Sequence, residues 1–297
     1  MSRPNKPRRI ADLAADLRAV IEYFHGFKIS MNRGRIRAYL DTLDAAGRGE
    51  PVDRALLYSA VCEVSDLLEV TSLDVMALQP LRHRLKSICG GDAIFTATSG
   101  DDPGRNVCFE LITGAMLQAT GARSEFENPA DVTTKVRGDL LLVECKRPTT
   151  LAALGRCLKK GYRQLSEHRR NGHRGFGAIA LEVSVLVNPD AGVLVAKDVA
   201  TAIEDLYRNI QRIFQESSEY LARAARDLRQ DAEVHFLLFR VKCMTGDKEG
   251  ANQNVAHVWH LEPTVEISSP EFQALYDFMK KQPGFTPGIW SMQHPGG

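Results

Sequence analysis

The sequence predicts an α/β fold preceded by an all-α N-terminal region. Residues 10–90 repeat their apolar side chains at helical spacing and read as helices only. Residues 98–106, TSGDDPGRN, then gather turn-forming residues and mark a boundary. Beyond this boundary, helical and strand-like segments follow in the order α-β-β-α-β, which indicates a sheet covered by helices.

The helical region shows apolar periodicity in four segments, at 10–24, 36–43, 56–68 and 73–88. Its charges are mixed in sign, and no residues in it stand at catalytic spacing. We therefore expect residues 10–90 to form a helical packing module that could bind a protein partner or self-associate. Contact with DNA is left open.

The second half of the chain is expected to hold the sheet. Residues 282–297 contain three Pro and four Gly and are expected to be irregular. The expected domains are 1–98, helical with a basic N-terminal arm, then 99–282, and a tail at 283–297. Helices are expected at 107–117, 151–170, near 199–229 and at 270–281, and strands at 131–136, 140–146, 176–187, 234–243 and 255–267.

Composition limits the classes of function. A hydrophobic content of 44% and a charged content of 25% are typical of a globular protein. The net charge of +1 provides no global attraction to nucleic acid, so any basic contact must be local. The six cysteines form no CxxC pair, which favours reduced core thiols. Without a long apolar run or a secretory signal, a cytoplasmic protein with no membrane partner is expected.

The strand at 140–146, LLLVECK, carries the first chemical signal. Side chains alternate along a strand, so Glu144 and Lys146 project from the same face. They follow an apolar run, where an ion pair is partly desolvated. Such a pair is held in one geometry only when another requirement, such as a functional site, demands it. An edge-strand salt bridge explains the same pair equally well.

The preceding strand supplies a second carboxylate. A hairpin that turns at residues 137–138 places Asp131 across from positions 144–146. Opposed Cβ atoms lie about 5 Å apart, so the two carboxylates can share one cation. Asp139 is the competing acid, but it lies on the other face and about 16 Å along the strand from Glu144. The register therefore selects Asp131.

Glu110 is the third acid of interest. It is the only charged residue in VCFELITGAML, residues 107–117. A helix this apolar is buried almost all round, and an unpaired carboxylate there would be costly or would become neutral. We expect Glu110 to face cations, and a partner-satisfied glutamate near the helix start is the alternative.

Three motifs follow one another along the chain: RNVCFEL at 105–111, PADV at 129–132 and VECKRP at 143–148. Their order resembles that of the PD-(D/E)xK superfamily of restriction-endonuclease-like nucleases, across about residues 105–187. The resemblance implies a mixed central sheet flanked by helices. In this chain Pro129 is separated from Asp131 by Ala130, which departs from the pattern of the family.

The resemblance implies that Asp131 and Glu144 bind Mg²⁺ or Mn²⁺ together with the backbone carbonyl of Cys145, and that Glu110 completes or supports the site. Lys146 would orient the attacking water and help to deprotonate it. The chemistry agrees, because phosphodiester hydrolysis adds negative charge to an anionic centre and hard carboxylate oxygens suit Mg²⁺. Without metal, these acids are expected to repel one another and strain the fold.

The helix at 151–170 is expected to contact phosphates, because it carries six cations and a single acid, Glu167. A solvated helix face explains these charges as well. Gln164 stands, by resemblance, where many relatives have a glutamine that points into the site. The six cations are Arg156, Lys159, Lys160, Arg163, Arg169 and Arg170, and Arg105 and Arg147 are weaker candidates of the same kind.

The expected function is a Mg²⁺-dependent endonuclease or nickase that acts on nucleic acid, with DNA preferred. The resemblance suggests bacterial or phage defence, restriction or repair. The alternative is a non-catalytic scaffold that binds nucleic acid or a protein partner through its helical domain. A zinc site is not expected, because His257 and His260 face opposite sides of a strand. The motifs of phosphate-loop nucleotide hydrolysis and serine acyl transfer do not occur.

Overall fold

The structure, a computed structural model, forms two compact units. It describes residues 8–99, 102–126, 129–228, 234–246, 252–264, 269–281 and 285–286. The first unit comprises 1–112, 184–204 and 242–256, and the second comprises 113–183, 205–241 and 257–297. Each unit takes several stretches of chain, because two strands and two helices pass from one unit into the other. A single boundary near residue 98 does not anticipate this division.

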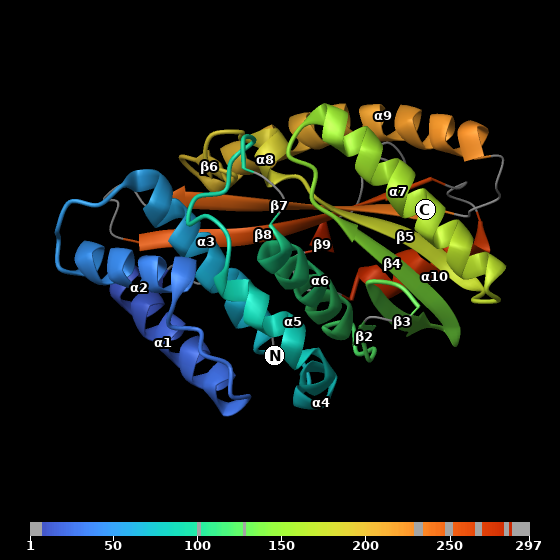
Figure 1. The fold of residues 1–297 in the computed structure, drawn as a ribbon. Helices are drawn as coiled ribbons and strands as arrows, with labels where there is room; N and C mark the ends of the chain where they lie inside the picture. Colours follow the sequence, from blue (N-terminus) through green and yellow to red (C-terminus); the bar gives the residue numbers. More distant parts are fainter. Residues whose placement is uncertain are drawn as a thin grey trace. The chain divides into compact units, whose positions relative to one another are not determined.

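The first unit is largely helical, in keeping with its periodicity (Figure 1). Its three long N-terminal helices pack against one another around Leu17, Phe24 and Leu43, which are completely buried. Asp53 caps the third of them by accepting a hydrogen bond from the Leu56 backbone N–H. The helices are α1 (Ile10–Gly26), α2 (Gly34–Gly47), α3 (Arg54–Val70), α4 (Val75–Leu78) and α5 (Arg82–Leu85), with 3₁₀ turns at Gln79–Leu81 and Lys86–Cys89.

The strands form a mixed sheet, as predicted. Their order is β1-β8-β7-β5-β4-β3-β2, with β6 paired to β7 and β9 paired to β8. β3 and β4 are antiparallel, whereas β4, β5 and β7 are parallel to one another. The strands are β1 (Arg8–Arg9), β2 (Glu125–Phe126), β3 (Val132–Val136), β4 (Asp139–Lys146), β5 (Gly175–Glu182), β6 (Leu194–Ala196), β7 (Phe236–Gly246), β8 (Asn252–Pro263) and β9 (Phe285–Thr286). An α/β fold with a helical N-terminal region is thereby confirmed.

The β3–β4 hairpin turns at the two residues that the sequence indicates. Arg137 and Gly138 have φ angles of 52° and 98° and form a two-residue turn in which both φ are positive. Val132, the first residue of β3, pairs with Val143, so continuing this register by one residue places Asp131 beside Glu144. The predicted register is confirmed.

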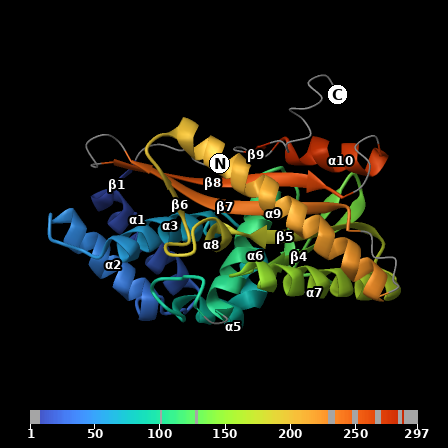
Figure 2. The same cartoon turned by 90° about the horizontal axis from the view of Figure 1, so that it is seen from above.

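The remaining helices are α6 (Pro103–Gln118), α7 (Leu151–Arg170), α8 (Ser184–Val187), α9 (Val199–Leu228) and α10 (Pro270–Met279). α7 runs alongside β4 and β5 (Figures 1 and 2). A Cβ on Gly161 would lie 3.0 Å from Ile179 of β5, and one on Gly155 would lie 2.6 Å from Tyr220 of α9. These glycines allow α7 to approach both elements closely.

Two expectations about elements are corrected. The strand expected at 176–187 ends at Glu182, and Ser184–Val187 forms a helical turn that the Asn188 N–H closes on the Ser184 carbonyl. A short apolar run cannot distinguish a strand from a buried helical turn. The tail expected to be irregular at 283–297 contains the short strand β9, and the short strands β1, β2 and β6 were not predicted either. Across the described residues, no helix is both long and apolar enough to cross a membrane.

Candidate active site at the end of the β3–β4 hairpin

Lys146 lies between two carboxylates. Its Nζ is 2.8 Å from Glu144 Oε2 and 3.1 Å from Asp131 Oδ2. The same Asp131 oxygen accepts a hydrogen bond of 2.8 Å from the Cys145 backbone N–H. The side chain of Glu144 is 1% exposed, whereas that of Asp131 is 26% exposed. The sequence therefore brings three of its candidate residues to one point, with Asp131 at the solvent side.

Strand geometry explains this convergence. Glu144 and Lys146 alternate with Cys145 along β4, so the pair shares one face and Cys145 takes the other. On that other face, Cys145 Sγ lies 3.6 Å from Thr113 Oγ1. Asp139 is exposed at the opposite end of β4, where it pairs with Val136. The register thus separates the competing acid from the site.

His168 joins the site from the last turn of α7. Its Nε2 lies 2.9 Å from Glu144 Oε1, the carboxylate oxygen that Lys146 does not contact. Sequence reasoning missed this residue. The available signal was that His168 continues the buried stripe of α7 formed by Leu154, Leu158 and Leu165. A polar residue in such a stripe requires a partner.

Burial and charge shift two pKa values in the site. Burial raises the pKa of Glu144, and the nearby charge of Asp131 raises it further, against the opposing effects of Lys146 and His168. Burial alone would lower the pKa of Lys146, but Glu144 and Asp131 outweigh it and raise that pKa. Lys146 therefore carries its proton at neutral pH.

The contacts of Lys146 bear on the expected repulsion among the acids, which stays a prediction. The ammonium of Lys146 contacts both Asp131 and Glu144, and His168 contacts the second oxygen of Glu144. Like charges in this site are thus offset by cationic or hydrogen-bonding neighbours.

Gln164 lies one helical turn before His168 on α7. Its Oε1 atom is buried and accepts no hydrogen bond within the described part of the chain. A buried acceptor without a donor is uncommon in folded proteins, because its desolvation is not offset. Arg147, which follows Lys146, is half-buried.

Glu110 lies in the first unit, in the middle of α6. Its carboxylate pairs with the guanidinium of Arg84 from α5. The cation that the apolar surroundings of Glu110 required is therefore a side chain of the protein. The role of Glu110 in completing or supporting a metal site stays a prediction.

Arg105 does not lie at the surface. Its side chain is 3% exposed, with Nε 2.8 Å from Glu63 Oε1 and Nη2 2.8 Å from the Tyr39 hydroxyl, and it also pairs with Asp102. The phosphate contact proposed for it from the sequence is replaced by a structural role. A phosphate contact requires an exposed guanidinium, whereas the guanidinium of Arg105 is buried and its ionic partners compensate that burial.

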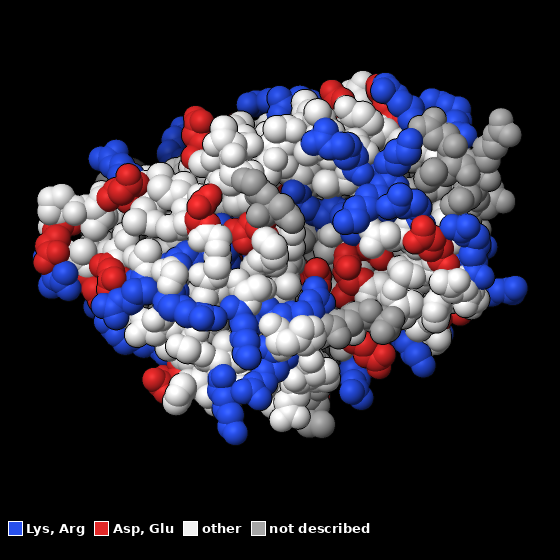
Figure 3. Space-filling model, viewed as in Figure 1, with Lys and Arg blue, Asp and Glu red and all other residues white. Residues whose placement is uncertain are grey.

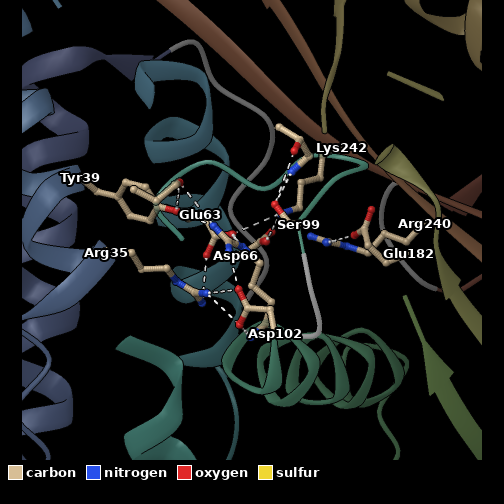
Figure 4. Close-up of polar contacts among 12 residues, drawn as sticks. Arg35, Tyr39, Glu63, Asp66, Ser99, Asp102, Glu182, Arg240 and Lys242 are labelled. Carbon is tan, nitrogen blue, oxygen red and sulfur yellow. Dashed lines mark hydrogen bonds and ion pairs between the residues drawn. The ribbon is translucent and has the colours of Figure 1, made fainter. Parts of the chain in front are cut away.

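Arg105 belongs to a buried ionic cluster in the first unit through its pairs with Glu63 and Asp102, both of which Figure 4 labels. Arg35, which is fully buried, pairs with Glu63 and Asp102, and Lys242 Nζ lies 2.9 Å from Asp66 Oδ2. The sequence offered no signal for this cluster, because α2, α3, α6 and β7 each contribute only one or two of its charges. Its three cations, Arg35, Arg105 and Lys242, balance three acids, Glu63, Asp66 and Asp102.

The basic side of α7 faces solvent. The helix buries one stripe that includes Leu158 and Leu165, so the cations on its other side are left outside. Figure 3 shows Lys and Arg side chains gathered over the surface that α7 occupies in Figure 1. The exposed cations are Arg156, Lys159, Lys160, Arg163, Arg169 and Arg170.

The donor set at the hairpin consists of two carboxylates. Asp131 and Glu144 both lie within 3.1 Å of a single cationic atom, Lys146 Nζ. Among the described residues, no group of three or more His, Cys, Asp and Glu side chains is arranged to hold a metal ion. Mg²⁺ usually keeps several waters and takes only one or two carboxylates from the protein, so this pair fits it.

Comparison with known proteins adds no relative. No family model matches the chain, and no match was found among curated proteins or among solved structures.

Proposed function

We propose that this chain is a metal-dependent phosphodiesterase of the PD-(D/E)xK type that cleaves nucleic acid, with DNA as the preferred substrate. The observation that carries the proposal is the convergence of Asp131, Glu144 and Lys146 at the end of one hairpin. A restriction-endonuclease-like core is part of the same proposal. It is supported by the mixed sheet and by the position of Asp131 directly before β3 and of Glu144 and Lys146 on β4.

Asp131 and Glu144 would hold the divalent ion, Mg²⁺ or Mn²⁺, with the backbone carbonyl of Cys145 as a further ligand. When bound, the ion would lower the pKa of a water molecule and stabilise the leaving alkoxide. The pair suits this role because both carboxylates already converge on one positive charge, and because Asp131 is open to solvent. Gln164 offers a buried acceptor nearby on α7 that lacks a donor.

Lys146 would act as a charged donor. Because its pKa is raised, it holds its proton at neutral pH and can orient the attacking water or a phosphate oxygen. Removal of a proton from water is less suited to a lysine in this state. His168 would keep Glu144 in position through its contact with Oε1, the carboxylate oxygen that Lys146 does not contact.

The exposed cations of α7 would hold the phosphate backbone near the reacting bond. Arg156, Lys159 and Lys160 lie on the same helix as His168, so they have a fixed relation to Glu144. Backbone contacts of this kind position a substrate without reading its sequence.

The test is cleavage of supercoiled plasmid by the full chain with and without Mg²⁺ or Mn²⁺. We expect metal-dependent nicking or linearisation that falls by at least about a hundredfold in Lys146→Ala, because the charge that it places at the reacting phosphate is lost. Asp139→Asn is the matched control, since it alters an exposed carboxylate at the other end of β4. Equal cleavage by wild type and Lys146→Ala would refute the proposal.

A non-catalytic scaffold is the second candidate. It is favoured by one observation: Lys146 satisfies both carboxylates without any added ion. In that case the chain would bind DNA but would not cleave it under any metal condition. The plasmid assay separates the two functions.

A further inference from the structure

Two segments of the first unit carry cations and no acids. Residues 23–40 hold one lysine, three arginines and one histidine, and residues 75–91 hold the run RHRLK at 82–86. Neither segment contains an Asp or a Glu. In a chain with a net charge of +1, such stretches concentrate positive charge locally. The fold decides whether they act together.

The structure brings the two segments side by side. Arg33 Nη2 lies 3.4 Å from the carbonyl oxygen of Lys86, and Cys89 Sγ lies 3.6 Å from the carbonyl oxygen of Ser30. Gly34, the first residue of α2, packs so closely that an added Cβ would lie 2.3 Å from the Cys89 carbonyl oxygen. The start of α2 and the α5 segment therefore form one continuous surface.

We call Arg33, Arg82, His83 and Lys86 the α2–α5 basic surface, because all four side chains are exposed there. Arg82 and Lys86 stand four residues apart and so project from one side of their helical segment. Arg84 between them pairs with Glu110, so it adds little net charge. Figure 3 shows Lys and Arg side chains gathered over the region of α5, whereas Asp and Glu side chains lie among them over α2.

We infer that the α2–α5 basic surface binds the phosphate backbone of nucleic acid. A backbone is a regular array of single negative charges, and Arg and Lys neutralise it without reading bases. Arg33 is held in place by the Lys86 carbonyl, which reduces the entropy lost on binding. α2 also begins here with no capping side chain and no acid in its first turn, so its dipole adds to the positive potential.

An anionic membrane is the competing ligand for such a surface. Membrane-binding helices combine basic residues with exposed aromatic or leucine side chains that enter the lipid. Among the described residues, the large hydrophobic side chains that are exposed are Val75 and Val195. Val75 lies at the start of the segment 75–91, but neither valine is one of the aromatic or leucine side chains that enter lipid, so nucleic acid is favoured.

The test measures binding of the full chain to a short fluorescent DNA duplex by anisotropy, in EDTA, over a series of salt concentrations. The variant is Arg82→Glu combined with Lys86→Glu. We expect Kd to rise at least about tenfold and the slope of log affinity against log salt to fall by about 2, since each lost phosphate contact contributes about 0.9.

The matched control is Arg48→Glu combined with Arg54→Glu. It makes the same change in charge in the same unit, at exposed residues beyond the far end of α2, about 20 Å from Arg33 at 1.5 Å per residue. We expect it to change affinity by less than threefold. The neutral pair Arg82→Gln and Lys86→Gln provides a second test with a smaller risk to folding.

Three results would overturn the inference: unchanged affinity and slope in both surface variants, equal weakening by the control pair, or tighter binding to phosphatidylserine vesicles than to DNA. The proposed catalytic function is tested separately. The binding test is made in EDTA and needs no cleavage, so unchanged affinity in the surface variants overturns this inference alone, whereas equal plasmid cleavage by wild type and Lys146→Ala overturns the proposed function alone.

Discussion

Lys146 donates to two carboxylates at once, and this double contact sets the character of the hairpin site. A buried ion pair is strongly destabilised when one partner is removed, because the other is left uncompensated. Here the ammonium has two acids, and Glu144 has two neighbours of its own, Lys146 and His168. Each side chain is therefore held in one geometry by more than one contact, which is what a catalytic group needs.

His168 provides the first prediction at this scale. His168→Leu removes the contact to Glu144 Oε1, and the Mn²⁺ concentration for half-maximal cleavage should rise about 10- to 100-fold. His168→Gln can place an amide nitrogen near the position of Nε2 and should restore most of that affinity. Metal-dependent cleavage across a Mn²⁺ series measures both variants. If the leucine variant needs no more Mn²⁺ than the wild type, His168 does not position Glu144.

Glu63 provides the second prediction at the scale of single residues. Burial raises its pKa, but Arg35, Arg105 and Lys242 outweigh burial and hold that pKa well below its ordinary value. Glu63→Gln should therefore lower the free energy of unfolding by about 3–5 kcal/mol at pH 7. A depressed folded-state pKa gives stability that is present above the unfolded pKa of about 4.3 and is lost as pH falls through the folded-state pKa.

Denaturant titrations at pH 7 and at lower pH check this prediction. The difference between wild type and Glu63→Gln should be largest at pH 7 and shrink below about pH 4. The exposed Glu50 is the matched control, and Glu50→Gln should change little at either pH. A difference that grows as pH falls would contradict the role given to Glu63.

At the scale of elements, the sequence could predict the site because the decisive information was local. The shared face of Glu144 and Lys146, the two-residue turn and the register that sets Asp131 opposite Glu144 all belong to one hairpin. His168 could not be placed with equal ease, because its contact depends on how α7 packs against β4. The ionic cluster around Arg105 could not be predicted from the sequence at all, since it joins residues from four separate elements.

The turn itself carries the third prediction. Gly138 has a φ of 98°, a region that side chains with a Cβ adopt only with strain. Gly138→Val should lower stability by about 1–2 kcal/mol, and any slip of register would also move Asp131 away from Lys146. The paired readouts are a thermal melt and plasmid cleavage. Gly172→Val is a control with a similar φ outside the hairpin, and it should lose stability while keeping Mg²⁺ affinity.

At the scale of the whole molecule, the two compact units are not two consecutive stretches of the chain. β7 and β8 each contribute residues to both units, so the two units cannot be separated at one point in the sequence. Hydrophobic periodicity indicates the longer helices and strands, but it missed the short strands β1, β2, β6 and β9 and does not reveal which strands pair across long separations. This is why the order of the strands in the sheet could not be predicted from the sequence.

The stability of the whole chain provides the fourth prediction. Asp131 accepts hydrogen bonds from the Cys145 N–H and from Lys146, so its charge is favourable even without metal. Asp131→Asn should therefore lower the melting temperature of the metal-free protein. Simple repulsion between the acids predicts the opposite, a higher melting temperature. Differential scanning calorimetry in EDTA measures it. A melting temperature above that of the wild type would show that repulsion dominates.

Direct titration of Mn²⁺ into the full chain tests the central claim that Asp131 and Glu144 share one divalent ion. Isothermal calorimetry should find a site in the wild type and in Asp139→Asn with equal affinity, because Asp139 lies at the other end of β4. Asp131→Asn should weaken that site by at least about tenfold, since it removes one charged ligand. Equal Mn²⁺ affinity in wild type and Asp131→Asn would contradict the shared-ion site.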